Sequence, residues 1–410
     1  MKAHAKRLPA IVRTGRGASL VEYGLVLGLV GLVGFPIVER LGDEISNLFG
    51  RSADAVSYAS ITVDDSLDPD AFVFEVSTAT GAIFPSSGGT IQIDWGDETA
   101  NASCTTTYVI DPNTPLTCDY PEAGIYQIAI TGDMTGYGQL YSAAYKADIT
   151  RMIQWGNTGL TDLSNAFYGA TNITTVPDQI PSSVSSINRI FAYARAINDP
   201  VISKWDTSNI ANFDFSFANA DSFNVDISNW NLSSAVSLTG TFRQALSFNR
   251  DISNWDVSSV QSMDYLFRGA SSFNQDLSTW DTSKVETMHR TFAQSDFNGD
   301  ISGWDTGSVV NMQSMFSENP AFNRDISNWD VSSVRRFDRM FLGSSSFSHD
   351  LSNWDTSSSD SFQQMFEEAH AFNSDISAWD VSNATNFYRM FFNGNSFNSD
   401  ISSWNVTARL

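Results

Sequence analysis

The 410-residue sequence is poor in cysteine, histidine and positive charge. It holds two cysteines, four histidines, and 23 lysines and arginines against 46 aspartates and glutamates, which gives a net charge of -23. An acidic surface repels phosphate backbones, so we expect no nucleic-acid partner. Two cysteines are too few for a zinc site, and His4, His289, His349 and His370 show no metal-type spacing. Phosphate-binding loops and Cys–His constellations are also missing from the sequence, so we predict that the chain is not an enzyme.

The two cysteines, Cys104 and Cys118, lie fourteen residues apart within strand-like sequence. Such a pair forms one disulfide where the compartment is oxidising, and the alternative is two buried free thiols. We expect the disulfide, because the rest of the sequence indicates a location outside the cell.

A basic leader and an apolar stretch make up the first part of the chain. Residues 1–17 carry five lysines and arginines and no acid, whereas residues 18–38 hold only two ionisable side chains, Glu22 and Tyr23. The apolar stretch is long enough to span hydrocarbon, and the charge asymmetry keeps the leader in the cytoplasm. An ordinary signal anchor has the same layout, but a carboxylate inside an apolar span is costly and usually functional.

The order Gly17, Ala18, Glu22, Tyr23 resembles the processing site of type IV prepilins of the Flp (Tad) type. The resemblance implies that a prepilin peptidase cleaves after Gly17, so that Ala18 becomes the mature N-terminus. It also implies that residues 18–50 form a hydrophobic pilin helix in which Glu22 and Tyr23 serve assembly with other pilin subunits. The protein would then pass from the inner membrane to the cell surface. Flp pilins usually stop soon after this helix, whereas this chain continues to residue 410.

The middle of the chain reads as a linker, residues 51–66, and a small β-sandwich, residues 67–150. Four alternating runs, AFVFEV, TIQIDWGD, TTYVI and IYQIAITGD, are separated by turn-forming residues. The segments DWGDET and CDYPEAGIYQIAITG resemble the PKD type of immunoglobulin-like domain. Asp94, Asp97 and Glu98 cluster in its W-G-D turn. We expect these carboxylates to cap the turn, and a bound cation is the alternative.

Residues 151–410 carry an internal repeat with a period of 25 residues. The thirteen residues FNRDISNWDVSSV occur twice, at Phe248–Val260 and at Phe322–Val334, and one residue is deleted between Phe292 and Phe297. Ten of the eleven tryptophans follow the period, at positions 155, 205, 230, 255, 280, 304, 329, 354, 379 and 404. A repeat of this length predicts a solenoid whose units stack around one continuous core.

Each of about eleven units is predicted to contain one short strand and one short helix. Apolar side chains three or four residues apart, such as Val260, Met263, Phe267 and Ala270, describe one face of a helix of about three turns. Ser258 stands at the N-cap position and begins a capping box. The segment SSFNQDLSTW predicts the strand. The expected fold class is therefore α+β, with a pilin-like helix, a β-sandwich and an α/β solenoid.

The repeat resembles that of BspA-like leucine-rich-repeat-type bacterial surface proteins, MFxxAxxFNxDISxWDxSxVxxM. The matching residues in one unit are Met312, Met315, Phe316, Ala321, Phe322, Asn323, Asp325, Ile326 and Trp329. The resemblance implies a surface-displayed binding solenoid without known chemistry. It also implies a PKD-like module ahead of the repeats, which is the order found here.

From residue 224 onward an asparagine and an aspartate also recur with the period, and they mark the candidate binding face: Asn224, Asn249, Asn274, Asp226, Asp251, Asp276 and Asp325. Stacked carboxylates repel one another by about 1 kcal/mol per neighbouring pair in water. Shared calcium ions would offset this repulsion, as would hydrogen bonds from backbone N–H groups at each turn. We expect the hydrogen bonds and no cofactor, because one aspartate per unit provides few calcium ligands.

We therefore expect a surface-displayed, pilin-like adhesin whose acidic solenoid binds an unidentified protein or glycan. The alternative is a structural minor pilin or a pseudopilin of a Tad or type II-like secretion system. Abundance distinguishes the two, because a major subunit would dominate sheared filaments whereas a decorating adhesin would be a trace component.

Overall fold

The computed structural model describes residues 67–96, 104, 106–111, 116–138 and 146–406. The predicted leader, apolar stretch and linker (1–17, 18–50 and 51–66) lie outside the described residues, and so do Gly17, Ala18, Glu22 and Tyr23. In the part of the chain that the structure does describe, no helix is long and apolar enough to cross a membrane.

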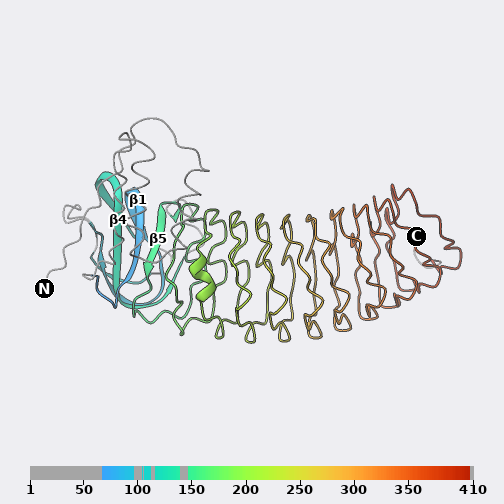
Figure 1. Cartoon of the computed structure of the whole chain (residues 1–410), viewed down its shortest axis with the longest axis horizontal. Coiled ribbons are helices and arrows are strands. Elements are labelled where there is room, and N and C mark those ends of the chain that lie inside the picture. Colours follow the sequence, from blue (N-terminus) through green and yellow to red (C-terminus); the bar gives the residue numbers. More distant parts are fainter. Residues whose placement is uncertain (1–66, 97–103, 105, 112–115, 139–145, 407–410) are drawn as a thin grey trace, which may run out of the picture. The chain divides into compact units, whose positions relative to one another are not determined.

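The N-terminal part of the described chain is an antiparallel sheet of five strands (Figure 1). The strands are β1 (Phe72–Ile83), β2 (Pro85–Asp94), β3 (Thr107–Val109), β4 (Leu116–Tyr137) and β5 (Ile149–Gln154), in the spatial order β3-β2-β4-β1-β5. The four alternating runs of the sequence lie in β1 to β4, which confirms these strands. The alternation places one face of each strand in the core, because successive side chains point to opposite faces of a sheet.

The prediction of a two-sheet sandwich is wrong, because β4 joins all the strands into one sheet. Its first part pairs with β1, from Leu116 opposite Ile83 onward, and its last part pairs with β2, ending with Tyr137 opposite Pro85. The register of β2 and β4 shifts near Gly132, which has a φ of 104°. A side chain there would place its Cβ 2.5 Å from the carbonyl oxygen of Thr90. A strand of 22 residues that bends at such points can pair with two neighbours in succession.

The sheet continues directly into the first coils of the solenoid. Besides its antiparallel pairing with β1, β5 forms a parallel bridge through Arg151 to Thr175. Gly136 of β4 bridges to Asp162 in the same way. One hydrophobic cluster extends through both regions, and Pro69–Leu410 form one compact unit. The boundary at residue 150 therefore falls within a strand that belongs to the sheet and also pairs with the repeats.

The predicted helix-and-strand unit of the solenoid is wrong. Between residues 151 and 406 the chain contains no α-helix. In the residues described after β5, the one named element is a short 3-10 helix, η2 (Pro200–Lys204). The coils instead join through isolated parallel bridges, one residue per coil: Asp162, Ser186, Asn212, Ser237, Ser262, Thr287, Asn311, Arg336, Ser361 and Asn386. These bridges do not fall in the segment SSFNQDLSTW that was predicted as a strand. The fold class is thus β rather than α+β (Figure 1).

A ribbon of tight turns occupies the place of the predicted helix. Two residues per coil, four positions apart, have the positive φ that ends a right-handed helix. They are Asn165 and Gly169, Arg189 and Tyr193, Phe215 and Asn219, Gly240 and Gln244, Tyr265 and Gly269, Arg290 and Gln294, Ser314 and Glu318, Arg339 and Gly343, Gln364 and Glu368, and Arg389 and Asn393. We call this surface the turn ribbon.

Hydrogen bonds explain why the turn ribbon replaces the helix. The N–H groups of Tyr265 and Phe267 donate to the carbonyls of His289 and Thr291 in the next coil, at 2.8 and 2.9 Å. Between them, the N–H of Leu266 closes a turn onto the carbonyl three residues earlier, at 3.2 Å. An α-helix would use every one of these donors internally. The ribbon directs alternate donors to its neighbour, so it holds the stack together as well as shaping the coil.

The tryptophans lie inside the solenoid, as predicted. Those from Trp155 to Trp379 are at most 6% exposed, and Trp404 of the last coil is half-buried. The indole rings of Trp255, Trp280 and Trp304 stack nearly parallel, with centroids 6.4 and 6.2 Å apart. From Trp205 onward each indole N–H donates to a main-chain carbonyl of the preceding coil, at 2.9 to 3.3 Å. Each indole is therefore both a core side chain and a cross-link between coils.

Candidate functional site

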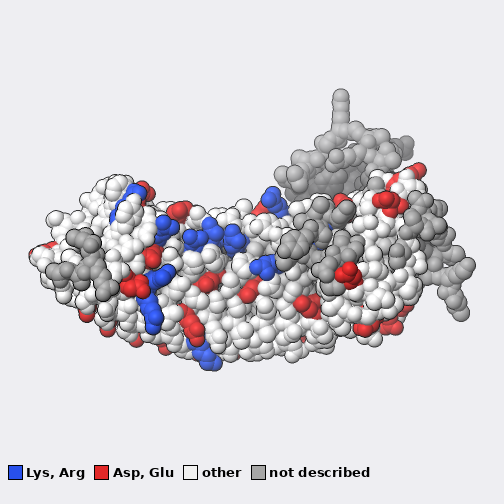
Figure 2. Space-filling model, turned by 180° about the vertical axis from the view of Figure 1, so that it is seen from behind, with Lys and Arg blue, Asp and Glu red and all other residues white. Residues whose placement is uncertain are grey.

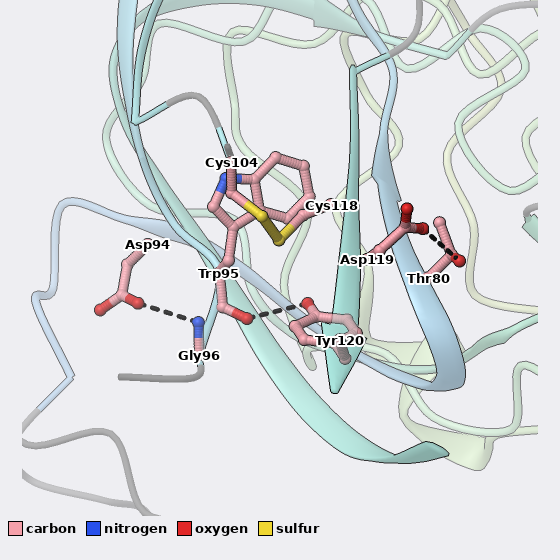
Figure 3. Close-up of a disulfide and its surroundings, with 8 residues drawn as sticks. All are labelled: Thr80, Asp94, Trp95, Gly96, Cys104, Cys118, Asp119 and Tyr120. Carbon is pink, nitrogen blue, oxygen red and sulfur yellow. Dashed lines mark hydrogen bonds between the residues drawn. A yellow bond between two sulfur atoms is a disulfide. The ribbon is translucent and has the colours of Figure 1, made fainter. Parts of the chain in front are cut away.

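The two cysteines form a disulfide, with Cα atoms 5.1 Å apart (Figure 3). Cys104 lies in the segment before β3, and Cys118 lies in β4. Nearby, the Asp94 carboxylate accepts a hydrogen bond from the Gly96 N–H at 2.9 Å, the geometry expected of a turn-capping carboxylate. Asp97 and Glu98 lie outside the described residues.

The aspartates of the candidate binding face form a regular row of exposed carboxylates. Each accepts a hydrogen bond from the N–H of the serine two residues later, at 2.8 to 3.1 Å. We call these eight residues the DIS row: Asp226, Asp251, Asp276, Asp300, Asp325, Asp350, Asp375 and Asp400. In each case the side chain closes its own turn, so the carboxylate is held in one orientation.

These hydrogen bonds offset the repulsion within the DIS row. The N–H and hydroxyl of Ser253 lower the pKa of Asp251, and this effect exceeds the opposing repulsion from Asp226. Hydrogen bonds from Ser377 likewise lower the pKa of Asp375. All eight side chains reach solvent, which further weakens their mutual repulsion. The row is therefore ordered by the protein's own hydrogen bonds.

A second row of turn-closing residues follows the tryptophans and was missed in the sequence. Each accepts an N–H from two residues later, at 2.9 to 3.1 Å: Asp206, Asn231, Asp256, Asp281, Asp305, Asp330, Asp355 and Asp380. The capping box predicted at Ser258 is wrong, because this serine donates to Asp256 and begins no helix. The recurring D-x-S spelling, shared with the DIS row, is the signal that would have identified the second row.

The predicted binding-face asparagines accept hydrogen bonds from the next coil, although Asn249 and Asn274 remain exposed. The N–H of Asn249 donates to the Oδ1 of Asn224 at 3.1 Å, and the N–H of Asn274 donates to the Oδ1 of Asn249 at 3.0 Å. The chain of bonds continues to the N–H of Ser348, which donates to Asn323 at 3.1 Å. These side-chain oxygens thus bind the neighbouring coil rather than their own turn. The DIS row supplies the charged part of the predicted face.

A hollow of about 430 Å³ lies between the DIS-row turns of the last coils. Its lining is Asp375, Ser377, Ser399, Asp400, Ser402 and Ser403. Within the described part of the chain, no three His, Cys, Asp or Glu side chains are grouped so that they could hold a metal ion. Two histidines of the solenoid contact main-chain carbonyls, His349 that of Asn323 and His370 that of Asn393.

Comparison with protein families assigns the repeats. Four overlapping matches, to residues 139–239, 161–279, 266–369 and 324–409, are to the family described as "Mycoplasma protein of unknown function, DUF285". Together they cover more than half of the chain. The chain belongs to this family. The match fits the resemblance to BspA-like repeat proteins, and most of the strand module and the first 66 residues lie outside it. No curated protein and no solved structure matches the chain.

Proposed function

We propose that the protein is a surface-displayed adhesin whose solenoid presents the DIS row to a partner. The observation that carries this proposal is the fixed orientation of eight carboxylates, seven of them exposed and that of Asp300 half-buried, each held by its own turn. Groups that are ordered before binding lose little conformational entropy when a partner binds. A weak contact that is repeated along the stack also adds up to a higher total affinity. The aromatic core supports this role because it makes the face rigid.

The partner is a protein or a glycan at another cell or surface, and it supplies positive groups or hydroxyl donors to the carboxylates. The anchoring part of the proposal depends on residues 18–50 and on their resemblance to Flp prepilins. In this proposal the strand module serves as a spacer, and the protein passes from the inner membrane to the cell surface. The solenoid performs no catalysis and needs no metal ion.

Replacing DIS-row aspartates by asparagine tests this proposal. Asn231 naturally occupies an equivalent turn in the second row, where its Oδ1 accepts the N–H of Ser233 at 2.9 Å. The triple variant Asp251→Asn, Asp276→Asn, Asp325→Asn should therefore keep the turns and remove only the charge. Cells that display the full chain would be tested for attachment to matrix proteins, mucin and other bacteria. We expect the number of attached cells to fall at least tenfold for the variant.

The matched control carries the same charge change in the second row, as Asp256→Asn, Asp281→Asn and Asp330→Asn. It should attach like the unmodified protein. Equal losses in both variants would mean that net charge alone matters, and unchanged attachment in the DIS-row variant would refute the proposed face. Thermal unfolding of both variants checks that the solenoid remains folded.

A further inference from the structure

The solenoid has a second charged surface, opposite in sign to the DIS row. Figure 2 shows Lys and Arg side chains gathered in a row along one face. Four half-buried arginines project from the turn ribbon, three on successive coils and the fourth two coils further on, together with one tyrosine. We call these residues the arginine patch: Arg243, Arg268, Arg290, Arg339 and Tyr265.

The arginine patch is not neutralised by the protein. Arg268 donates from Nε and a terminal nitrogen to the amide oxygen of Gln294, at 3.1 and 2.8 Å, and Arg339 donates to that of Gln364 at 2.8 Å. Both acceptors are uncharged. Among the described residues, no carboxylate lies within ion-pair distance of any of the four guanidinium groups. With 46 acids against 23 bases in the chain, an unpaired cluster of arginines is the less expected arrangement.

The arrangement also leaves donors unused. The Nε of Arg243 is buried and has no hydrogen-bond partner. The guanidinium groups of Arg268 and Arg290 lie 6.0 and 5.9 Å from the ring centroid of Tyr265, so they flank the ring without using their N–H groups on it. Burial lowers the pKa of Arg268, and the charges of Arg243 and Arg290 lower it further. An anion placed between these groups would relieve that repulsion.

A hollow of about 100 Å³ lies where such an anion would bind. Arg268, Arg290 and Arg339 line it, with Gln294, Glu318 and two serines. Glu318 is the one carboxylate in the lining, and it accepts a hydrogen bond from the Gln294 side chain at 2.9 Å. Three guanidinium groups against one carboxylate leave the hollow positive, although the whole chain is strongly negative.

We propose that the arginine patch binds the carboxylates of an acidic polysaccharide built from uronic acid residues. The planar fork of a guanidinium group matches a planar carboxylate with two parallel hydrogen bonds. A polymer with one carboxylate per sugar also suits sites that recur along a stack. The distant acids of the chain oppose this binding little, because charges more than about 10 Å apart are largely screened at 0.1 M salt.

This inference deepens the proposed adhesin function by naming a ligand for a different face, so the two can fail separately. A duplex nucleic acid is a poorer ligand because it carries about one charge per 1.7 Å, which the acidic remainder of the chain repels more strongly. Dextran sulfate represents the other anionic sugar chemistry. Both polymers are therefore comparison arms of the test, and neutral dextran is the baseline.

The test measures binding of the full-length chain in detergent to immobilised polygalacturonate. The variant Arg268→Gln, Arg290→Gln should bind at least tenfold more weakly, because it loses two forks and keeps polar, uncharged side chains. The matched control Arg250→Gln, Arg324→Gln changes the charge equally at exposed positions beside the DIS row, and it should bind within twofold of the unmodified chain.

A further variant, Arg268→Lys with Arg290→Lys, retains the charge and removes the forks, and it should bind with intermediate strength. Four results would overturn the inference: no binding to polygalacturonate, equal weakening in the patch variant and its control, tighter binding to duplex DNA, or tighter binding to dextran sulfate. If the triple DIS-row variant binds polygalacturonate normally, the two faces are independent. Thermal unfolding of each variant separates lost binding from lost folding.

Discussion

Truncation of one indole in the middle of the stack should cost far more than truncation of the last one. Trp280 is 2% exposed and lies between Trp255 and Trp304. Replacing a buried tryptophan by alanine typically costs about 3–5 kcal/mol. Trp280→Ala also removes the indole N–H bond to the Ile252 carbonyl, worth about 1 kcal/mol, although this carbonyl keeps the N–H of Trp255. We therefore expect a loss of about 4–6 kcal/mol in the free energy of unfolding.

The matched variant is Trp404→Ala in the last coil. Trp404 is half-buried. An interior indole stacks between two others, whereas Trp404 stacks on Trp379 alone, at 6.4 Å. It makes the same type of hydrogen bond, to Ile376 at 3.0 Å. Its loss should cost about half as much as the loss of Trp280, because about half of the packing disappears.

Guanidinium unfolding followed by far-UV circular dichroism measures both variants. In a solenoid each coil is stabilised mainly by its neighbours, so an interior defect should also split the transition into two steps. Trp404→Ala should keep one transition. Equal losses at the two positions, with a single transition in each, would refute the view that stacking between coils provides the stability.

Four other results are expected. Ser348 stands where the neighbouring coils have Asn323 and Asn373, so it interrupts the row of asparagine side-chain acceptors. Ser348→Asn should supply an acceptor for the N–H of Asn373 and raise the unfolding free energy by about 1 kcal/mol. Unchanged stability would show that this interruption costs nothing. Burial lowers the pKa of Lys146 to about 7 from 10.5. Between pH 7 and pH 10 only the unfolded state keeps the proton, so the free energy of unfolding should rise over this range. Lys146→Met should flatten this rise, and the control Lys284→Met should not. Added calcium should barely change the melting temperature, and a rise of tens of degrees would restore the calcium interpretation of the DIS row. Mass spectrometry of the exported protein should find Ala18 as the first residue, and an intact Met1 would favour a plain signal anchor.

The period of the tryptophans was sufficient to predict the core of the solenoid. A side chain that recurs every 25 residues must occupy the same place in every coil, and a large apolar ring is stable there only if it is buried. The same reasoning located the one-residue deletion in a turn: Phe292 and Phe297 still stack, at 3.9 Å, like Phe267 and Phe273 in the preceding coil. Core and register thus followed from identity and spacing alone.

The backbone of each coil could not be predicted in this way. Val260, Met263, Phe267 and Ala270 are all buried, as the helix predicted, but a chain of three-residue turns buries the same positions. Spacing alone does not separate these two structures. The turns form instead of a helix because alternate N–H groups donate to carbonyls of the next coil. These hydrogen bonds exist only after the units stack. The positive φ of Tyr265 depends on the same contacts, because an isolated tyrosine disfavours that conformation.

The arginine patch shows why charge counts mislead for a solenoid. Arg243 and Arg268 are one 25-residue period apart, and Arg290 and Arg339 are two periods apart less the one-residue deletion, but the two pairs occupy different positions of the repeat. They meet because the left-handed positions of the turn ribbon and the positions beside them face the same side of successive coils. A net charge of -23 describes the chain as a whole and says nothing about a surface where three guanidinium groups oppose one carboxylate. In a stacked fold, the charge that a ligand meets is set by which coil positions face it, and the sum over the chain can have the opposite sign.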